Sequence, residues 1–226
     1  MSAAYIFETP VIAPDFRRRL EVVSERDPLG VDGVCMNYAR GEEIFGEEDP
    51  ADFVYRVASG VVRTYKILSD GRRQIGEFYL PGDVFGLETG EDHTLSAEAV
   101  NGLSVFAMRR RTLEHTAETD CDLARKLWAI TLHDLRRSQE HMLLLGRKGA
   151  LERLAWFLMD MAARIPAERD LFLPMSRQDI ADYLGLTIET VSRSMTQLQD
   201  EALIELQGCR HVILRNRASL NMLTAA

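Results

Sequence analysis

The first half of the chain has the hydrophobic pattern of short strands. Between residues 35 and 110, apolar and polar residues alternate over short runs that turn sequences separate. Ser-Gly at 59–60 ends one run, and Ser-Asp-Gly at 69–71 stands between the runs at 61–68 and 74–80, which is a hairpin signal. Strands this short and regularly spaced predict an antiparallel β-sandwich or barrel.

The period of the pattern changes after Thr112, where steps of four and three residues indicate one face of a helix. The positions on that face are Ala124, Trp128, Thr131, Leu135, Ser138, Met142 and Leu145. Such a seam over about three heptads predicts a long helix that pairs with a copy of itself in a two-fold dimer. The alternative is that this helix packs on its own β domain. It stays open because the small residues of the seam give little apolar surface for pairing with a second copy.

The sequence Gly-Arg-Lys-Gly at 146–149 interrupts this helical pattern and predicts a domain boundary. We therefore divide the chain into a β domain at 1–111, a dimerisation helix at 112–145 and a C-terminal domain at 146–226. The C-terminal domain opens with an amphipathic stretch that ends at Pro166.

Two helices joined by a short turn follow. Ser176 and Asp179 resemble a capping box at the start of the first helix. Gly185 stands where a helix end needs a left-handed residue, and Thr187 can cap a second helix that runs from 188 to about 200. Helix, short glycine turn and helix form the helix-turn-helix pattern. Residues 203–214 then read as a β-hairpin, which would be the wing of a winged helix.

The second helix separates its side chains into two faces at about 100° per residue. The polar arc holds Glu189, Ser192, Arg193 and Thr196. The opposite, apolar face holds Val191, Met195 and Leu198. Short polar side chains with one Arg and one Glu favour a surface that reads bases, whereas a merely solvated face more often carries Lys and several Glu residues. The solvated face remains the alternative.

The polar arc has the chemistry to read DNA. An Arg donates two hydrogen bonds to guanine, a Glu accepts from cytosine, a Ser does either, and an apolar side chain contacts the thymine methyl. We therefore predict base reading of double-stranded DNA by Ile188, Glu189, Ser192 and Arg193. Contacts to the DNA backbone are expected from Ser176, Arg177, Thr187, Thr190, Thr196 and, in the wing, Arg210.

Composition and charge fit this division. Apolar residues make up 46% and charged residues 27% of the chain, as in ordinary globular proteins. Residues 1–146 hold 17 basic and 25 acidic residues, whereas residues 147–226 hold 10 of each, so the net charge of −8 lies outside the predicted DNA-binding part. The chain shows neither a signal peptide nor a run of about 18 apolar residues, so we expect a cytoplasmic protein that binds no membrane.

Candidate metal, redox and catalytic residues are few. Cys35, Cys121 and Cys209 are far apart and odd in number, which indicates reduced thiols rather than a disulfide framework. Cys209, in the predicted wing, is a possible redox switch, with an inert thiol as the alternative. The β-barrel also leaves open a metal-dependent enzyme, but the five histidines lie at no metal-ligand spacing: His93, His115, His133, His141 and His211. We expect no enzyme activity and no metal.

Three stretches together resemble the cAMP-receptor/FNR superfamily of bacterial regulators, over about residues 35–220. They are Val-Ala-Ser-Gly-Val-Val-Arg-Thr-Tyr at 57–65, Leu-Pro-Gly-Asp-Val-Phe-Gly at 80–86, and the helix-turn-helix. The resemblance implies an α+β fold: an N-terminal antiparallel β-roll of the cyclic-nucleotide-binding type, a long dimerisation helix and a C-terminal winged helix-turn-helix.

The reading triplet of Glu189, Ser192 and Arg193 resembles that of FNR, and residues 65–75 look closest to FixK regulators. This resemblance implies a homodimeric activator that binds palindromic TTGAT-like half-sites, recruits RNA polymerase and controls genes for low-oxygen respiration or nitrogen fixation.

The chain departs from the ligand-binding members of the superfamily. Leu87 and Leu95 stand where cAMP-binding members carry a Glu and an Arg, so a cyclic phosphate would lack its bidentate partner. The cysteine cluster that holds the iron–sulfur group of FNR is absent as well. We therefore expect no cofactor, and a regulator of the same fold gated by another small molecule or by redox state remains the alternative.

Overall fold

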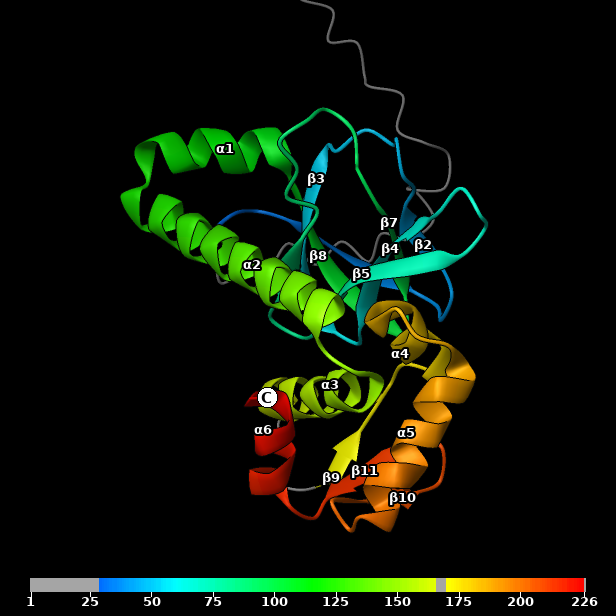
Figure 1. Ribbon diagram of the computed structural model, residues 1–226. Coiled ribbons are helices and arrows are strands. Elements are labelled where there is room, and N and C mark those ends of the chain that lie inside the picture. Colours follow the sequence, from blue (N-terminus) through cyan, green and yellow to red (C-terminus); the bar gives the residue numbers. More distant parts are fainter. Residues whose placement is uncertain (1–28, 166–169, 226) are drawn as a thin grey trace, which may run out of the picture.

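Eight strands in the described part of the N-terminal half form two antiparallel sheets that pack face to face as a β-roll (Figure 1). One sheet has the order β1 (Val34–Tyr38), β8 (Leu103–Arg109), β3 (Phe53–Ser59) and β6 (Val84–Phe85). The other has the order β2 (Glu43–Phe45), β7 (Ser96–Ala99), β4 (Val62–Ile67) and β5 (Arg73–Tyr79). Apolar side chains of both sheets share one core, which confirms the predicted antiparallel β domain.

The structure is a computed structural model that describes residues 29–165 and 170–225. The expectations for the first 28 residues and for Pro166 lie outside these ranges. Within them, the predicted hairpin is present as β4 and β5, with Ile67 paired to Arg73 and a positive φ of 80° at Gly71 in the turn. A second glycine, Gly60, is required by close packing rather than by its turn alone. A Cβ there would lie 2.4 Å from the carbonyl oxygen of Gly102.

The helical segment after the β-roll differs from the prediction at both ends. It consists of α1 (Arg110–Thr119) and α2 (Cys121–Arg147), so residues 112–145 are not one helix. Asp120 separates the two helices, because its side chain accepts from the backbone N–H groups of Asp122 and Leu123 and so starts a new helix. At the other end α2 continues through Gly146, and the chain becomes extended only at Lys148 and Gly149.

The C-terminal domain is a winged helix-turn-helix. It contains α3 (Ala150–Arg164), β9 (Asp170–Phe172), α4 (Arg177–Leu184), α5 (Ile188–Asp200), β10 (Ile204–Gln207), β11 (His211–Leu214) and α6 (Arg217–Ala225). The hairpin of β10 and β11 is the predicted wing, and β9 adds a third antiparallel strand to it. In Figure 1 this domain lies below the β-roll, with α4 next to β5 and α5 on the outer edge.

The two domains share a hydrophobic core that is built on β5. Ile75 and Phe78 of β5 belong to the same buried cluster as the apolar side chains of α3, α4 and α5. The ring of Phe78 lies 5.3 Å from that of Tyr183 and 6.3 Å from that of Phe157, measured between centroids. Burial of aromatic surface between domains is strongly favourable, so the C-terminal domain is docked on the β-roll rather than tethered to it.

Candidate nucleic-acid interface

The helix-turn-helix has the end groups that its sequence predicts. The Ser176 hydroxyl accepts from the backbone N–H of Asp179, whose carboxylate accepts from the backbone N–H of Ser176, so the capping box is confirmed. Gly185 ends α4 in the left-handed conformation, with a φ of 61°. The Thr187 hydroxyl caps α5 by accepting from the backbone N–H of Thr190. These caps set the short turn that places α5 across α4.

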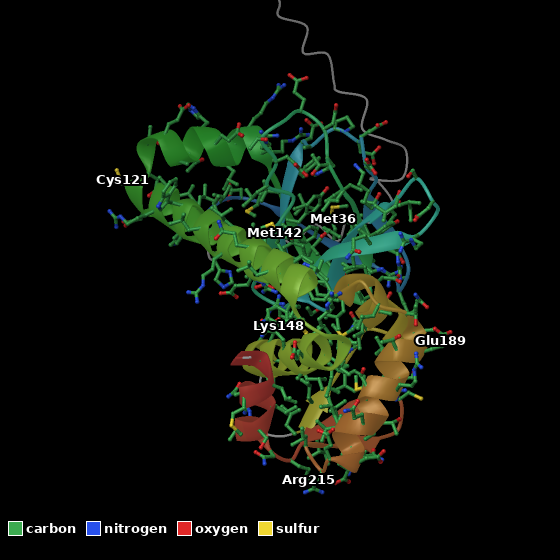
Figure 2. All side chains as sticks on the ribbon, in the orientation of Figure 1. Met36, Cys121, Met142, Lys148, Glu189 and Arg215 are labelled. Carbon is green, nitrogen blue, oxygen red and sulfur yellow. The ribbon has the colours of Figure 1, made fainter. Side chains whose placement is uncertain are left out.

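The two faces of α5 also lie as predicted. Val191 and Leu198 are fully buried and Met195 is 2% exposed, so the apolar face anchors the helix in the core. On the opposite side Glu189 and Arg193 are exposed. Figure 2 shows Glu189 at the outer edge of α5, where it also lines an open groove that faces the β4–β5 hairpin. The polar arc is therefore presented to solvent and can approach a partner.

The groups on the polar arc are charged or ready to donate. Hydrogen bonds from the Glu189 backbone and from Thr187, with the nearby charge of Arg193, lower the pKa of the Glu189 carboxyl below its usual value. The carboxylate is thus an acceptor at neutral pH. Ser192 is half-buried, and its hydroxyl oxygen accepts from Arg177 Nη1 at 3.3 Å. That bond leaves the hydroxyl proton of Ser192 free to be donated.

Arg177 was predicted only as a backbone contact, yet the structure brings it to the reading helix. It lines, with Ser192, Arg193 and Thr196, an open hollow of about 380 Å³ beside α5. The sequence pattern did not reveal this proximity, because Arg177 and Ser192 are on different helices. The two guanidinium groups of the hollow attract phosphate oxygens, and the carboxylate of Asp200, which lines the same hollow, offsets part of their charge.

The other predicted backbone contacts are spread over three elements. Thr187 and Thr196 are exposed and Thr190 is half-buried, all on or next to α5. The Ser176 hydroxyl already donates to Asp179, at 2.8 Å, so it would have to break this bond to donate to a phosphate. Arg210 is half-buried in the turn between β10 and β11.

The predicted seam of α2 is on the face that the chain leaves uncovered. Trp128 is 65% and Met142 64% exposed, Leu135 is exposed as well, and Leu132 and Leu143 widen the apolar surface. The remaining seam positions are exposed or half-buried, at Ala124, Thr131, Ser138 and Leu145. Figure 2 shows Met142 on the surface of α2.

A second stripe on α2, which the sequence reading missed, packs on the rest of the chain. It also steps by four and three residues, one position before the seam: Leu123, Leu127, Ile130, Asp134, Arg137, His141 and Leu144. Leu123 and Leu144 are almost fully buried, and His141 stacks on Tyr183 of α4 at 4.0 Å between ring centroids. Self-pairing and packing on the chain's own domains are therefore not exclusive readings of this helix, because each has its own face.

Arg153 of α3 is a further residue that the sequence reading missed. Its guanidinium donates to the backbone carbonyls of Lys148, Leu184 and Leu145, each at 2.9 Å. These carbonyls belong to the ends of α2 and α4 and to the link before α3. One side chain thus holds the junction from which the helix-turn-helix extends.

The β-roll has a cavity of about 170 Å³, and its lining includes Leu87 and Leu95, the two positions where the resemblance to cAMP-binding members implies a Glu and an Arg. Its lining consists of Phe45, Thr64, Tyr79, Phe85, Gly86, Leu87, Glu88, Thr94, Leu95 and Asp134. These residues include two carboxylates and no basic side chain, and the volume is below the roughly 300 Å³ of the smallest usual ligand pockets. Leu95 reaches to 3.2 Å from the place of a Cβ on Gly76. The residues present do not fit a cyclic nucleotide.

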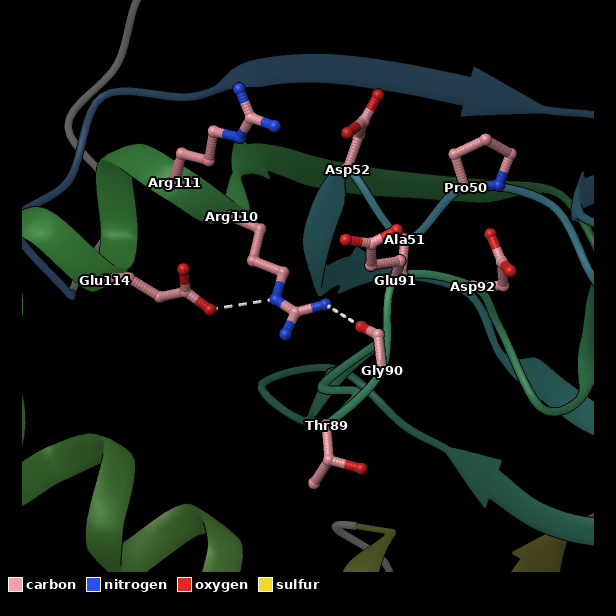
Figure 3. A pocket seen from close by; sticks show the side chains of 10 residues that line it. All are labelled: Pro50, Ala51, Asp52, Thr89, Gly90, Glu91, Asp92, Arg110, Arg111 and Glu114. Atoms are coloured by element: carbon pink, nitrogen blue, oxygen red, sulfur yellow. Dashed lines mark hydrogen bonds and ion pairs between the residues drawn. The ribbon is translucent and has the colours of Figure 1, made fainter.

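A further hollow lies on the β-roll, and an exposed thiol lies in the wing. The hollow on the rim of the β-roll has a volume of about 480 Å³. Arg110 of α1 binds Glu114 and the carbonyl of Gly90 there (Figure 3). Cys209 is exposed in the wing turn. No three potential metal ligands gather anywhere in residues 29–165 and 170–225, and within the same ranges no helix is long and apolar enough to cross a membrane.

Comparison with known proteins agrees with this geometry. Residues 35–120 match the model of the cyclic nucleotide-binding domain, and residues 152–223 match that of the Crp-like helix-turn-helix domain. The nitrogen fixation regulation protein FixK of Azorhizobium caulinodans is 48% identical over 94% of this chain and 86% of its own length. The chain belongs to the CRP/FNR family of transcription regulators.

Within this family the chain is of the FixK type. The FixK of Rhizobium meliloti is 42% identical over 87% of this chain and 90% of its own length. The solved structure of FixK2 from Bradyrhizobium japonicum superposes with a TM-score of 0.83, at 53% identity, over 86% of this chain and 98% of that chain. The predicted fold and the predicted class, a DNA-binding FNR/FixK-type regulator, are thus confirmed.

Proposed function

We propose that two copies of this chain join through the exposed face of α2 and insert their α5 helices into successive major grooves of a palindromic DNA site. The proposal rests on one observation: Glu189 and Arg193 are exposed on one side of α5, while Val191 and Leu198 anchor the opposite side in the core. A two-fold dimer presents two such helices about 34 Å apart, which is one turn of the duplex.

Each half-site is read by the start of α5. Arg193 donates to a guanine, Glu189 accepts from a cytosine, Ser192 donates its free proton to a base acceptor, and Ile188 contacts a thymine methyl. TTGAT-like half-sites offer these partners. Phosphate contacts come from Arg177, Thr187, Thr190, Thr196 and Arg210, with Ser176 as a contact that requires its hydroxyl to turn.

The three parts of the chain have separate tasks in this proposal. Residues 1–111 form the β-roll domain, residues 112–145 carry the dimer contacts and residues 146–226 bind DNA. The bound dimer recruits RNA polymerase and activates transcription. Relatives named nitrogen fixation regulation proteins support targets in nitrogen fixation or low-oxygen respiration.

Binding requires no effector in this proposal. The C-terminal domain is already docked through Phe78, and the β-roll cavity is small, acidic and partly filled by Leu95. A ligand shifts an equilibrium only by binding two conformations differently, and this cavity offers little room for such a ligand. The second candidate is redox gating, for which the exposed Cys209 in the wing is the group in position.

The test is a gel-shift titration of purified, effector-free protein. The probes are a duplex with two inverted TTGAT half-sites, centred about ten base pairs apart, and the same duplex with scrambled half-sites. We expect two chains per specific duplex and an affinity at least about 10³-fold above that for the scrambled duplex. Equal affinity for both probes contradicts the proposal. Peroxide treatment of the wild type and of Cys209→Ser tests the redox alternative, which requires inhibition of the wild type alone.

A further inference from the structure

An ion cluster joins the β-roll to the first helix of the helix-turn-helix. Arg63 of β4 binds Asp179 of α4 at 2.9 Å, measured from Nη1 to Oδ1. Arg73 of β5 binds the same Asp179 oxygen at 2.6 Å and Asp182 at 2.7 Å. The second Nη of Arg63 binds Glu98 of β7 at 2.7 Å, which ties the cluster into the sheet. All five side chains are at most 22% exposed.

Asp179 has two tasks in this cluster. Its Oδ2 accepts from the backbone N–H and the hydroxyl of Ser176 and so starts α4, while its Oδ1 accepts from the two arginines. Burial opposes ionisation of this carboxyl, but the Ser176 hydrogen bonds and the charges of Arg63 and Arg73 outweigh it and lower its pKa. The direction of α4 is therefore tied to the β-roll through its own cap.

The cluster is one of several attachments of the DNA-binding domain to β5. Further along the strand, Gln74 donates to the carbonyl of Tyr183, and Arg164 of α3 donates to the carbonyl of Phe78 and pairs with Glu77. Arg73 is at the start of this strand, and Phe78, which packs on Tyr183 and Phe157, is near its end. They are five positions apart along the strand, which is about 17 Å. Attachments at both ends of one strand oppose a swing of the domain about either end, and the cluster is the ionic one at the start of the strand.

Directly beside the cluster, the side chains of the β4–β5 hairpin and of the start of α5 do not pack against each other. A groove of about 810 Å³ separates the β4–β5 hairpin from the start of α5, between Leu68 and Arg72 on one side and Thr187 and Ile188 on the other. Arg73, Gln178 and Asp182 line the same groove. At this edge, polar contacts rather than packed side chains hold the helix-turn-helix at its distance from the β-roll.

We propose that the cluster of Arg63, Arg73, Asp179 and Asp182 sets the half-site spacing that this regulator accepts, by fixing the angle of each DNA-binding domain on its β-roll. The inference rests on the proposed binding of a dimer to two half-sites. Neighbouring base pairs are about 3.4 Å apart along the duplex, so a shift of α5 by that distance corresponds to one base pair of spacing. Arg73 and Asp182 are then positioning residues, which act on DNA through the direction of α5.

The test compares spacing preference between variants of the full chain. Arg73→Met removes the charge with little change in volume and leaves Asp179 paired with Arg63 and Asp182 bonded to Gln178. Arg72→Met is the matched control, because Arg72 is the adjacent residue, has a 79% exposed side chain and pairs with Asp70. Arg73→Lys is the conservative variant. The probes are duplexes with the optimal spacing, with one base pair added or removed, and with a single half-site.

For Arg73→Met we expect the affinity ratio of optimal to shifted spacing to fall by about tenfold, or 1.4 kcal/mol. Affinity for a single half-site should stay within about twofold, since no base contact is removed. Arg73→Lys should recover most of the ratio, and Arg72→Met should leave it unchanged. An unchanged ratio in Arg73→Met, or an equal loss on every probe including the single half-site, would overturn the inference.

Two further measurements distinguish failure of the cluster's role from failure of the proposed function. If Arg73→Met shows a lower melting temperature than the wild type, Asp182→Asn repeats the test with a smaller change. Sedimentation of the wild type with each probe checks that a dimer binds two half-sites. A wild type that binds one chain per duplex, or ignores spacing, refutes the proposed function, whereas strict spacing in both wild type and Arg73→Met refutes only the role of the cluster.

Discussion

The helices α2 and α5 are built alike but leave different faces uncovered. Each buries one stripe of side chains in its own chain, through Leu123 and Leu144 in α2 and through Val191 and Leu198 in α5. The uncovered face of α2 is apolar, with Trp128 65% exposed, whereas that of α5 is polar and charged. From this difference we predict different partners, an apolar surface for α2 and a polar one for α5.

The physical reason lies in the cost of removing each face from water. Burial of apolar surface is favourable by about 25 cal/mol per Å² with any apolar partner, and a second copy of the same face is always available. A polar arc loses its hydrogen bonds to water unless the partner offers matching donors and acceptors. Base edges in the major groove offer them, and an apolar protein surface does not.

A charge on the uncovered face of α2 gives the largest expected effect. Leu135→Glu would place one carboxylate from each subunit in the dimer contact, where an unpaired buried charge costs several kcal/mol. We expect a monomer in sedimentation and a loss of operator affinity of about 100-fold or more. His133→Glu, on an exposed position of the same helix away from the seam, is the control. A Leu135→Glu protein that remains dimeric would show that this face is not the interface.

A cavity behind the polar arc should act on the stability of the chain rather than on its assembly. Leu198→Ala removes a fully buried side chain that holds α5 in the core, so we expect a loss of about 2–5 kcal/mol in the free energy of unfolding. Urea unfolding followed by circular dichroism measures it. Gln197→Ala, exposed on the neighbouring position, should change stability by less than about 0.5 kcal/mol. Equal effects of the two would contradict the anchoring role of the apolar face.

The smallest expected effect is the loss of one base contact. Arg193→Ala should weaken binding to the specific duplex by about 1–3 kcal/mol and relax selection at a single guanine of each half-site. A gel-shift series with each base replaced at that position measures both quantities. Arg111→Ala removes the same charge from exposed α1, far along the chain from α5, and should change neither. Undiminished selectivity in Arg193→Ala would remove this residue from the reading set.

Much of the fold was predictable because its signals are local. The Ser-Asp-Gly turn of the β4–β5 hairpin, the caps at Ser176 and Thr187 and the left-handed Gly185 each depend on a few adjacent residues. The two faces of α5 follow from its periodicity alone. The positions of Glu189 and Arg193 on an outward arc could therefore be stated before any coordinates.

The remainder depends on contacts between distant residues. Arg63 and Asp179 meet although 116 positions separate them, and no local pattern marks them as partners. The inner stripe of α2 was hidden by polar members such as Asp134 and Arg137, which a hydrophobic pattern does not count. The break at Asp120 was missed because the helical signals on both sides of it are continuous, and only the cap distinguishes one helix from two.

The small, acidic cavity of the β-roll has a consequence for how such a regulator is controlled. Where no effector binds the small cavity that Leu87 and Leu95 line, as proposed above, the amount of protein becomes the input. Below the dissociation constant of a two-chain complex, the concentration of dimer grows as the square of the chain concentration, so a doubling of synthesis raises it about fourfold. A gene circuit built on such a chain gains steepness from stoichiometry alone.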